Sequence, residues 1–183
     1  MRPTVAMLCM IFIVSLNASA QILPKQFWKL LQENRMFYSI PAGFVQTPVI
    51  KNDDVQYDFA IKSKEKKIEI RYKIWPVNRL QRNGNDGSNV MLMTMALNIS
   101  NGKMTEPNQF PKESVKEEFG ADDGSTTMVP VDSEFGKGYK MCMLNVIHKD
   151  YTADAYTFYL FDDPKVLLQT MGNMAVFHAL TFK

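Results

Sequence analysis

VQYDFAIKSKEKKIEIRYKIW, residues 55–75, is the stretch that decides the fold. Two runs rich in alternating apolar residues, 55–62 and 67–75, flank the polar segment 63–66, which is typical of a β-hairpin. A register in which Lys62 faces Lys67 places four apolar pairs on one side of the sheet: Ile61 with Ile68, Phe59 with Ile70, Tyr57 with Tyr72, and Val55 with Ile74. The other side pairs Asp58 with Arg71, so we expect that side to be partly wet.

Three further strands are predicted as a meander at residues 126–134, 139–148 and 155–162. Gly136 and Gly138 suit the first turn, and Pro130 places the first strand at an edge or a bulge. The other two strands are apolar on both faces, which indicates central strands of a sheet covered on both sides.

Helices are predicted at residues 22–36, 91–99 and 111–119, with a long final helix that starts at Asp163 and Pro164. Short strands are expected at 37–40 and 180–182, and residues 122–125 are expected to form a turn. This order of elements predicts an α+β fold in which a mostly antiparallel sheet is flanked by helices, an α/β/α sandwich.

The first twenty residues have the pattern of a secretory signal peptide. Arg2 precedes an apolar run from Val5 to Leu16, and Ala18-Ser19-Ala20 supplies small residues for cleavage. This run is shorter than the roughly 18 residues that a membrane-spanning helix needs. We therefore expect residues 21–183 to be a single exported domain, periplasmic or extracellular, with no transmembrane anchor after cleavage.

The charge balance and the cysteine content limit the classes of function that we expect for the mature chain. Arg2 is the one charged residue of the leader, so 20 of the 21 basic residues remain beside 19 acidic ones. A nearly neutral chain argues against nucleic-acid binding, which needs a concentrated basic face. Cys142 is the single cysteine of residues 21–183, so no intramolecular disulfide is expected, and its apolar surroundings favour a buried, inert thiol.

An aromatic residue, an Ile-Pro pair and a Gly-aromatic pair follow one another in Phe37-Tyr38-Ser39-Ile40-Pro41-Ala42-Gly43-Phe44. This motif resembles the opening of the PsbP and Mog1 superfamily, with Phe44 in place of the usual tryptophan. The likeness covers most of residues 35–183, including the late paired strands and the final helix. The resemblance implies the sandwich fold and an accessory role, as in photosystem subunits, a nuclear GTPase-binding protein and exported bacterial proteins of unassigned role. It carries over no catalytic residues.

Methionines form the most conspicuous group of candidate metal ligands. Met91, Met93 and Met95 lie at alternate positions, and Met141 and Met143 flank Cys142. Thioethers are suitable ligands for Cu(I), but three alternate residues converge only on a strand, whereas a helix separates them by about 200°. Because residues 91–99 are predicted to be helical, core packing is the favoured interpretation, and we expect no metal or cofactor.

A small enzyme that uses Cys142 is a further hypothesis. His148 lies six strand residues away, about 20 Å, which is too far for a nucleophile and base pair. His178 is the remaining histidine that could reach Cys142. Neither histidine has a carboxylate at a recognised metal spacing.

The remaining candidate site is the segment Trp75-Pro76-Val77-Asn78-Arg79-Leu80-Gln81-Arg82. A tryptophan at a strand end, followed by Arg79 and Arg82, is typical of a partner-binding edge. The alternative is that Trp75 closes the core and the arginines are solvated. The sequence thus favours an exported, non-catalytic binding or accessory domain with a protein partner. Cu(I) handling through methionines and a small enzyme using Cys142 remain as alternatives.

Overall fold

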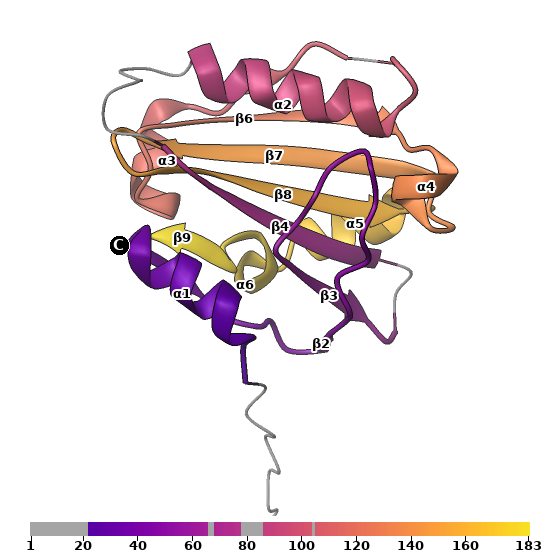
Figure 1. Ribbon diagram of the computed structural model, residues 1–183, viewed down its shortest axis with the longest axis horizontal. Coiled ribbons are helices and arrows are strands. Elements are labelled where there is room, and N and C mark those ends of the chain that lie inside the picture. Colours follow the sequence, from indigo (N-terminus) through magenta and orange to yellow (C-terminus); the bar gives the residue numbers. More distant parts are fainter. Residues whose placement is uncertain (1–21, 66–67, 78–85, 104) are drawn as a thin grey trace, which may run out of the picture.

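A seven-stranded antiparallel sheet runs through the centre of the molecule, with the strand order β2-β3-β4-β8-β7-β6-β5 (Figure 1). The computed structural model describes residues 22–65, 68–77, 86–103 and 105–183. The strands of this sheet are β2 (Phe44–Gln46), β3 (Phe59–Ser63), β4 (Ile68–Pro76), β5 (Asn108–Gln109), β6 (Asp123–Pro130), β7 (Met141–Lys149) and β8 (Ala153–Phe161). A separate two-stranded sheet pairs β1 (Met36–Tyr38) with β9 (Leu180–Phe182).

Helices cover both faces of the large sheet, which confirms the predicted α+β fold. They are α1 (Lys25–Glu33), α2 (Asp86–Ile99), α3 (Lys112–Phe119), α4 (Ser133–Gly136), α5 (Pro164–Met171) and α6 (Met174–Phe177). The buried apolar side chains of α2 and α4 belong to one core cluster, and those of the other four helices, β1 and β9 belong to a second. We call these two sides of the sheet the α2 face and the α1 face. Figure 1 shows α2 above the sheet, with α1 and β9 below it.

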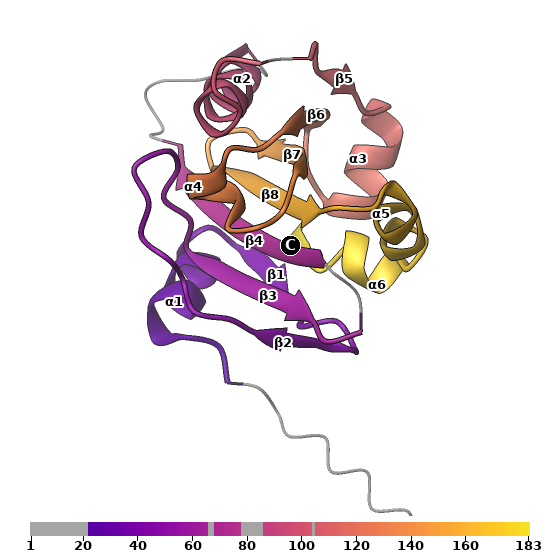
Figure 2. The same cartoon turned by 90° about the vertical axis from the view of Figure 1, so that its right-hand side faces the viewer.

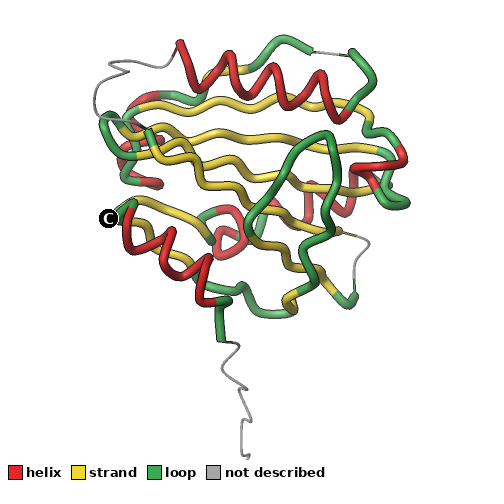
Figure 3. Tube along the Cα trace, viewed as in Figure 1, coloured by secondary structure: helices red, strands yellow, loops and turns green. Residues whose placement is uncertain are grey.

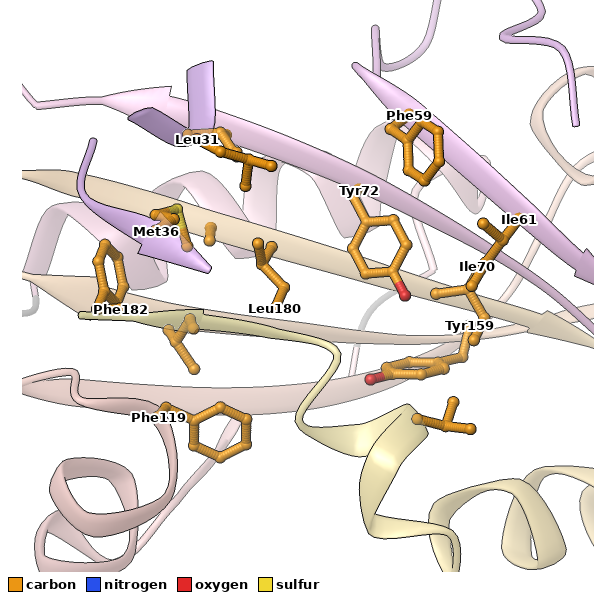
Figure 4. Packing of buried hydrophobic residues seen from close by; sticks show 14 of the residues in the cluster. Leu31, Met36, Phe59, Ile61, Ile70, Tyr72, Phe119, Tyr159, Leu180 and Phe182 are labelled. Atoms are coloured by element: carbon orange, nitrogen blue, oxygen red, sulfur yellow. The ribbon is translucent and has the colours of Figure 1, made fainter. Parts of the chain in front are cut away.

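The core of the α1 face is held together by aromatic side chains from distant parts of the sequence (Figure 4). The ring of Phe27 in α1 stacks on that of Phe59 in β3, with centroids 4.6 Å apart. Tyr38 of β1 meets Phe59 and Tyr72 edge-on, at 5.3 and 5.0 Å. The small β1–β9 sheet is therefore packed as a second layer against the large one.

The β3–β4 hairpin forms, but its predicted register is wrong by two residues. Phe59 pairs with Tyr72 and Ile61 with Ile70. The shift is an even number, so each of these side chains keeps its face of the sheet. The longer expected pairing fails because Asp58 ends it: its Oδ2 accepts the Ile74 N–H at 2.8 Å, a bond that a strand partner would otherwise make.

Residues 55–57 cross to the other face of the sheet instead of extending β3. Val55 and Tyr57 belong to the core of the α2 face, whereas Phe59 belongs to that of the α1 face. They end the long loop between β2 and β3, which Figure 3 shows in green. This loop reaches α2 and α4, since the Asp54 carbonyl accepts from Asn98 Nδ2 and Asp53 N–H donates to Glu134 Oε1.

The expectation of a partly wet face around Arg71 is also wrong. The guanidinium carbon of buried Arg71 lies 4.8 Å from the ring centroid of Tyr57 and 4.7 Å from that of Phe135. Arg71 Nε donates to Glu69 Oε1 at 2.7 Å, and Nη1 donates to the Phe135 carbonyl. Two rings brought in by the β2–β3 loop and by α4 thus replace water around this charge.

The meander is confirmed, with β8 and β7 in the interior of the sheet. Pro130 pairs only with Met141 of β7, because the other neighbour, β5, pairs with residues 125 and 126. The predicted turn at 122–125 is wrong: β6 starts at Asp123, which pairs with His148. The cause is that β6 pairs along β7 up to His148, whose carbonyl also accepts the Asp122 N–H at 2.8 Å.

The final helix is two helices and not one. The Asp163 side chain caps α5 by accepting from Lys165 N at 2.9 Å, as expected. After Gly172, the Asn173 side chain accepts from Ala175 N at 3.1 Å and starts α6. Met174, the first residue of α6, is 52% exposed.

The Arg71 arrangement yields a stability prediction. Arg71→Met leaves Glu69 without its buried partner, so we expect the free energy of unfolding to fall by about 3 kcal/mol. The double variant Glu69→Leu/Arg71→Met removes both charges and should recover to within about 1 kcal/mol of the wild type. Urea unfolding followed by circular dichroism measures both values. Lys73→Met, on the same strand and face, serves as the control, and an Arg71→Met loss no larger than that of the control would contradict the prediction.

Candidate functional site

A cleft of about 510 Å³ opens at one end of the sheet and is lined in part by Pro76, the residue after Trp75. Three segments line it: the end of α1 with residues 33–35, the end of β4 with residues 76–77, and the β7–β8 turn with residues 150–152. They lie at the end of the molecule where the C-terminus is marked in Figure 1. We call Trp75, Tyr151 and this cleft the Trp75 surface.

The α1 wall of the cleft is fixed by the residues that end the helix. Asn34 directs both its backbone N–H and its Nδ2 to the Leu30 carbonyl, at 3.1 and 2.8 Å. Arg35 then takes a positive φ of 51° and turns the chain into β1. Its carbonyl accepts the Lys183 N–H at 2.9 Å. The end of the chain therefore holds this wall in place.

The opposite wall is fixed by a buried histidine that contacts two aspartates. His148 Nδ1 lies 2.6 Å from Asp154 Oδ1, and Nε2 lies 3.0 Å from Asp150 Oδ1. Burial lowers the pKa of His148, but hydrogen bonds to the two aspartates and their charges outweigh it, so the pKa is raised above its ordinary value. Both ring nitrogens are engaged, so His148 braces the two aspartates and is not a free base.

Backbone bonds complete the bracing of this turn. Asp150 N–H donates to Asp122 Oδ2 at 2.8 Å, and Val77 N–H donates to the Thr152 carbonyl at 3.1 Å. The second bond joins the turn to the chain that leaves β4. Both walls are thus rigid without a bound partner.

Trp75 is one of the last paired residues of β4 and directly precedes Pro76, which lines the cleft. It pairs with Asp154 in the β4–β8 ladder, and 44% of its surface is exposed. The Lys73 ammonium lies 5.4 Å from its ring centroid. Tyr151, at the tip of the β7–β8 turn, is 49% exposed. The interpretation in which Trp75 closes the core does not fit this exposure. Arg79 and Arg82 lie outside the described residues.

The other sulfur and histidine candidates are not brought together. Met91, Met93 and Met95 lie on α2, as the helix prediction expected, so they do not converge as a strand would allow. Cys142 belongs to the core of the α2 face, where burial raises its pKa. His178 lies on the α1 face, with Nε2 2.8 Å from Glu118 Oε2 and its ring against Phe119. The sheet therefore separates the thiol from this histidine.

The brace formed by His148, Asp150 and Asp154 was missed in the sequence. The strands expected at 139–148 and 155–162 stop short of Asp154, although His148 and Asp154 pair directly across the β7–β8 turn. Extending both strands by one or two residues around the turn would have placed these two side chains on one face. Among the described residues, no group of three or more His, Cys, Asp or Glu side chains is arranged to hold a metal ion.

No protein-family model matches the sequence, and no curated protein matches it. Across the described part of the chain, no helix combines the length and apolar character that crossing a membrane requires.

The His148 brace yields a pH-dependent prediction. A raised pKa in the folded state means that His148 contributes stability that is fully present below its unfolded value of about 6.5 and is lost as the pH rises through the folded value. His148→Gln should lower the free energy of unfolding by about 3 kcal/mol at pH 6. It should also flatten the decline of stability above that pH.

Urea unfolding from pH 5 to 9 measures this effect. His178→Gln, which changes the other histidine of the chain, is the control measured over the same pH range. A His148→Gln profile that still falls as steeply above pH 6.5 as the wild type would contradict the assignment.

Proposed function

We propose that this chain is an exported, non-catalytic binding or accessory domain of the PsbP and Mog1 type that docks a protein partner through the Trp75 surface. The observation that carries the proposal is the exposed indole of Trp75 at the end of β4, where the next residue, Pro76, lines a cleft with two braced walls. Export rests on the leader pattern of residues 1–20, which lie outside the described part of the chain.

The composition of the Trp75 surface supports protein binding. Tryptophan, tyrosine and arginine are the residues that contribute most often to interface hot spots. This surface presents Trp75 and Tyr151, both about half exposed, with Arg35 on the wall of the cleft. A partner side chain that entered the cleft would contact Tyr151, which lines it, while another part of the same partner would cover Trp75. Aromatic anchors next to a pocket are the usual centre of such an interface.

The rigidity of the walls supports the same conclusion. Association is weakened by the entropy lost when loops and side chains become ordered. The β7–β8 turn is already tied to β4 through Val77 and to β6 through Asp122, and α1 is tied to the C-terminus through Arg35. A partner would therefore meet a preformed surface, and little binding energy would be spent on ordering it.

The alternatives have weaker geometric support. Cu(I) handling through Met91, Met93 and Met95 needs an extended segment, and these residues lie on a helix. Cysteine catalysis needs an accessible thiolate, and burial raises the pKa of Cys142 on the face of the sheet opposite His178. A docking role uses Trp75 and Tyr151, whose side chains are already exposed in the structure.

The two tryptophans of the chain provide a matched test. Trp75→Ala should weaken partner binding by about 2 kcal/mol, which is roughly a thirtyfold rise in Kd. Trp28, also exposed but in the part of α1 that does not line the cleft, is the control, and Trp28→Ala should leave Kd within about twofold of the wild type.

The partner is identified first by photocrosslinking. A benzophenone amino acid at position 75 or at position 28 is irradiated in the native envelope and secreted fractions, and crosslinked proteins are identified by mass spectrometry. A protein captured from position 75 and not from position 28 is then used for the Kd measurements. Equal capture from both positions, or an unchanged Kd for Trp75→Ala, would contradict the proposal.

A further inference from the structure

A second cavity, of about 330 Å³, lies on the α1 face of the sheet, away from the Trp75 surface. Its walls are five apolar side chains from three segments: Phe110 after β5, Met143 of β7, and Met171, Met174 and Phe177 of the α5–α6 region. Figure 2 shows α3, α5 and α6 gathered beside β6 and β7 on this side of the molecule. We call this cavity the methionine pocket.

The walls of the methionine pocket are apolar and adaptable. Thioether side chains are flexible and polarizable, so they fit ligands of irregular shape. The rings of Phe110 and Phe177 meet edge-on at 6.4 Å and close one side. Met174, 52% exposed, leaves a thioether in contact with water at the rim. The volume falls in the range of about 300–1,000 Å³ that is usual for small-molecule sites.

The floor of the methionine pocket carries one amide. Asn145 is only 7% exposed, and its Oδ1 accepts the Thr126 hydroxyl at 2.6 Å. Among the described residues, Asn145 Nδ2 donates no hydrogen bond. Nδ2 is not among the fully buried polar atoms that lack a partner, so it stays accessible from the pocket that Asn145 lines. A ligand acceptor in the pocket can therefore reach this free donor.

The cavity also has a defined depth. Beneath Asn145 and Phe177 lies a space of only about 10 Å³, bordered by Thr157 and Tyr159. Such a space is close to the lower limit for one water molecule. A ligand that enters past Met174 consequently stops with its inner end at Asn145.

We propose that the methionine pocket binds a small hydrophobic molecule that carries one carbonyl group, with the carbonyl oxygen accepting a hydrogen bond from Asn145 Nδ2. The apolar body of the ligand lies among the three thioethers and two phenyl rings. This site is independent of the Trp75 surface, which lies at one end of the sheet, and it can be tested whether or not a protein partner is found.

The test compares two probes of similar shape, benzophenone and diphenylmethane, of which only the first has a carbonyl. The natively processed chain is labelled with ¹³C at its methionine methyl groups and titrated with each probe. Benzophenone should shift the signals of Met143, Met171 and Met174, while Met91 and Met93 on α2 serve as controls in the same spectrum. One net hydrogen bond should make the Kd for diphenylmethane roughly three- to tenfold higher.

Variants locate the interaction. Asn145→Leu should make the two Kd values equal, because it removes the donor and keeps the volume. If this variant fails to fold, the comparison of the two probes on the wild type still decides the role of a donor. Met174→Ser should weaken benzophenone binding several-fold, whereas Leu168→Ser, at an exposed position of α5 that does not line the pocket, should not.

Three results would overturn the proposal. The first is a benzophenone titration that leaves Met143, Met171 and Met174 unshifted up to the solubility limit. The second is equal affinity of the wild type for the two probes. The third is a response of these three methionines to Cu(I) with none to benzophenone, which would assign the pocket to a metal that prefers thioether ligands.

Discussion

The structure depends on the ladder between β4 and β8, in which nine consecutive pairs run from Ile68 with Phe161 to Pro76 with Ala153. Every residue of β8 except Thr157 is buried, so both faces of this strand must be covered. That requirement explains the two layers: α2 and α4 on one face, and the β1–β9 sheet with four helices on the other. The Trp75 surface lies where the ladder ends and the covering stops.

Because both faces of the sheet are covered, the charged side chain of Arg71 in β4 lies inside the core of the α2 face. Arg71 stands directly opposite Phe158 of β8, where no water reaches it. Its charge is stabilised by Glu69 and by the faces of Tyr57 and Phe135, two side chains that belong to irregular segments. The crossing of the β2–β3 loop from one face to the other is therefore linked to the burial of this arginine.

The local sequence pattern was sufficient to predict most helices and strands. It was insufficient to predict which residues of other elements they pair with or pack against. The helices at 91–99 and 111–119 and the strands of the meander have clear periodicity, and they form close to the predicted positions. The register of the β3–β4 hairpin was wrong because a side chain, Asp58, takes the place of a strand partner. The break between α5 and α6 was missed because Asn173 at a cap and Asn173 within a helix look alike in a sequence. Alternation assigned Arg71 to water, whereas burial depended on Phe135, 64 positions away.

In the candidate sites, too, local sequence signals were readable, whereas contacts between distant segments were not. Trp75 could be identified from sequence because a tryptophan before a proline at a strand end is a local signal, and its exposure agrees with that prediction. The cleft beside it could not, since its walls come from residues 33–35, 76–77 and 150–152. The methionine pocket is a stronger case, because in the sequence Met143 stands out only as one of the two methionines that flank Cys142. Strand geometry sends Cys142 to the α2 face and Met143 to the α1 face, where the break after Gly172 supplies Met171 and Met174. The sequence thus shows Met143 next to Cys142, although their side chains lie on opposite faces of the sheet. Alternation on a strand separates neighbouring side chains, and tertiary packing determines which other side chains each of them contacts.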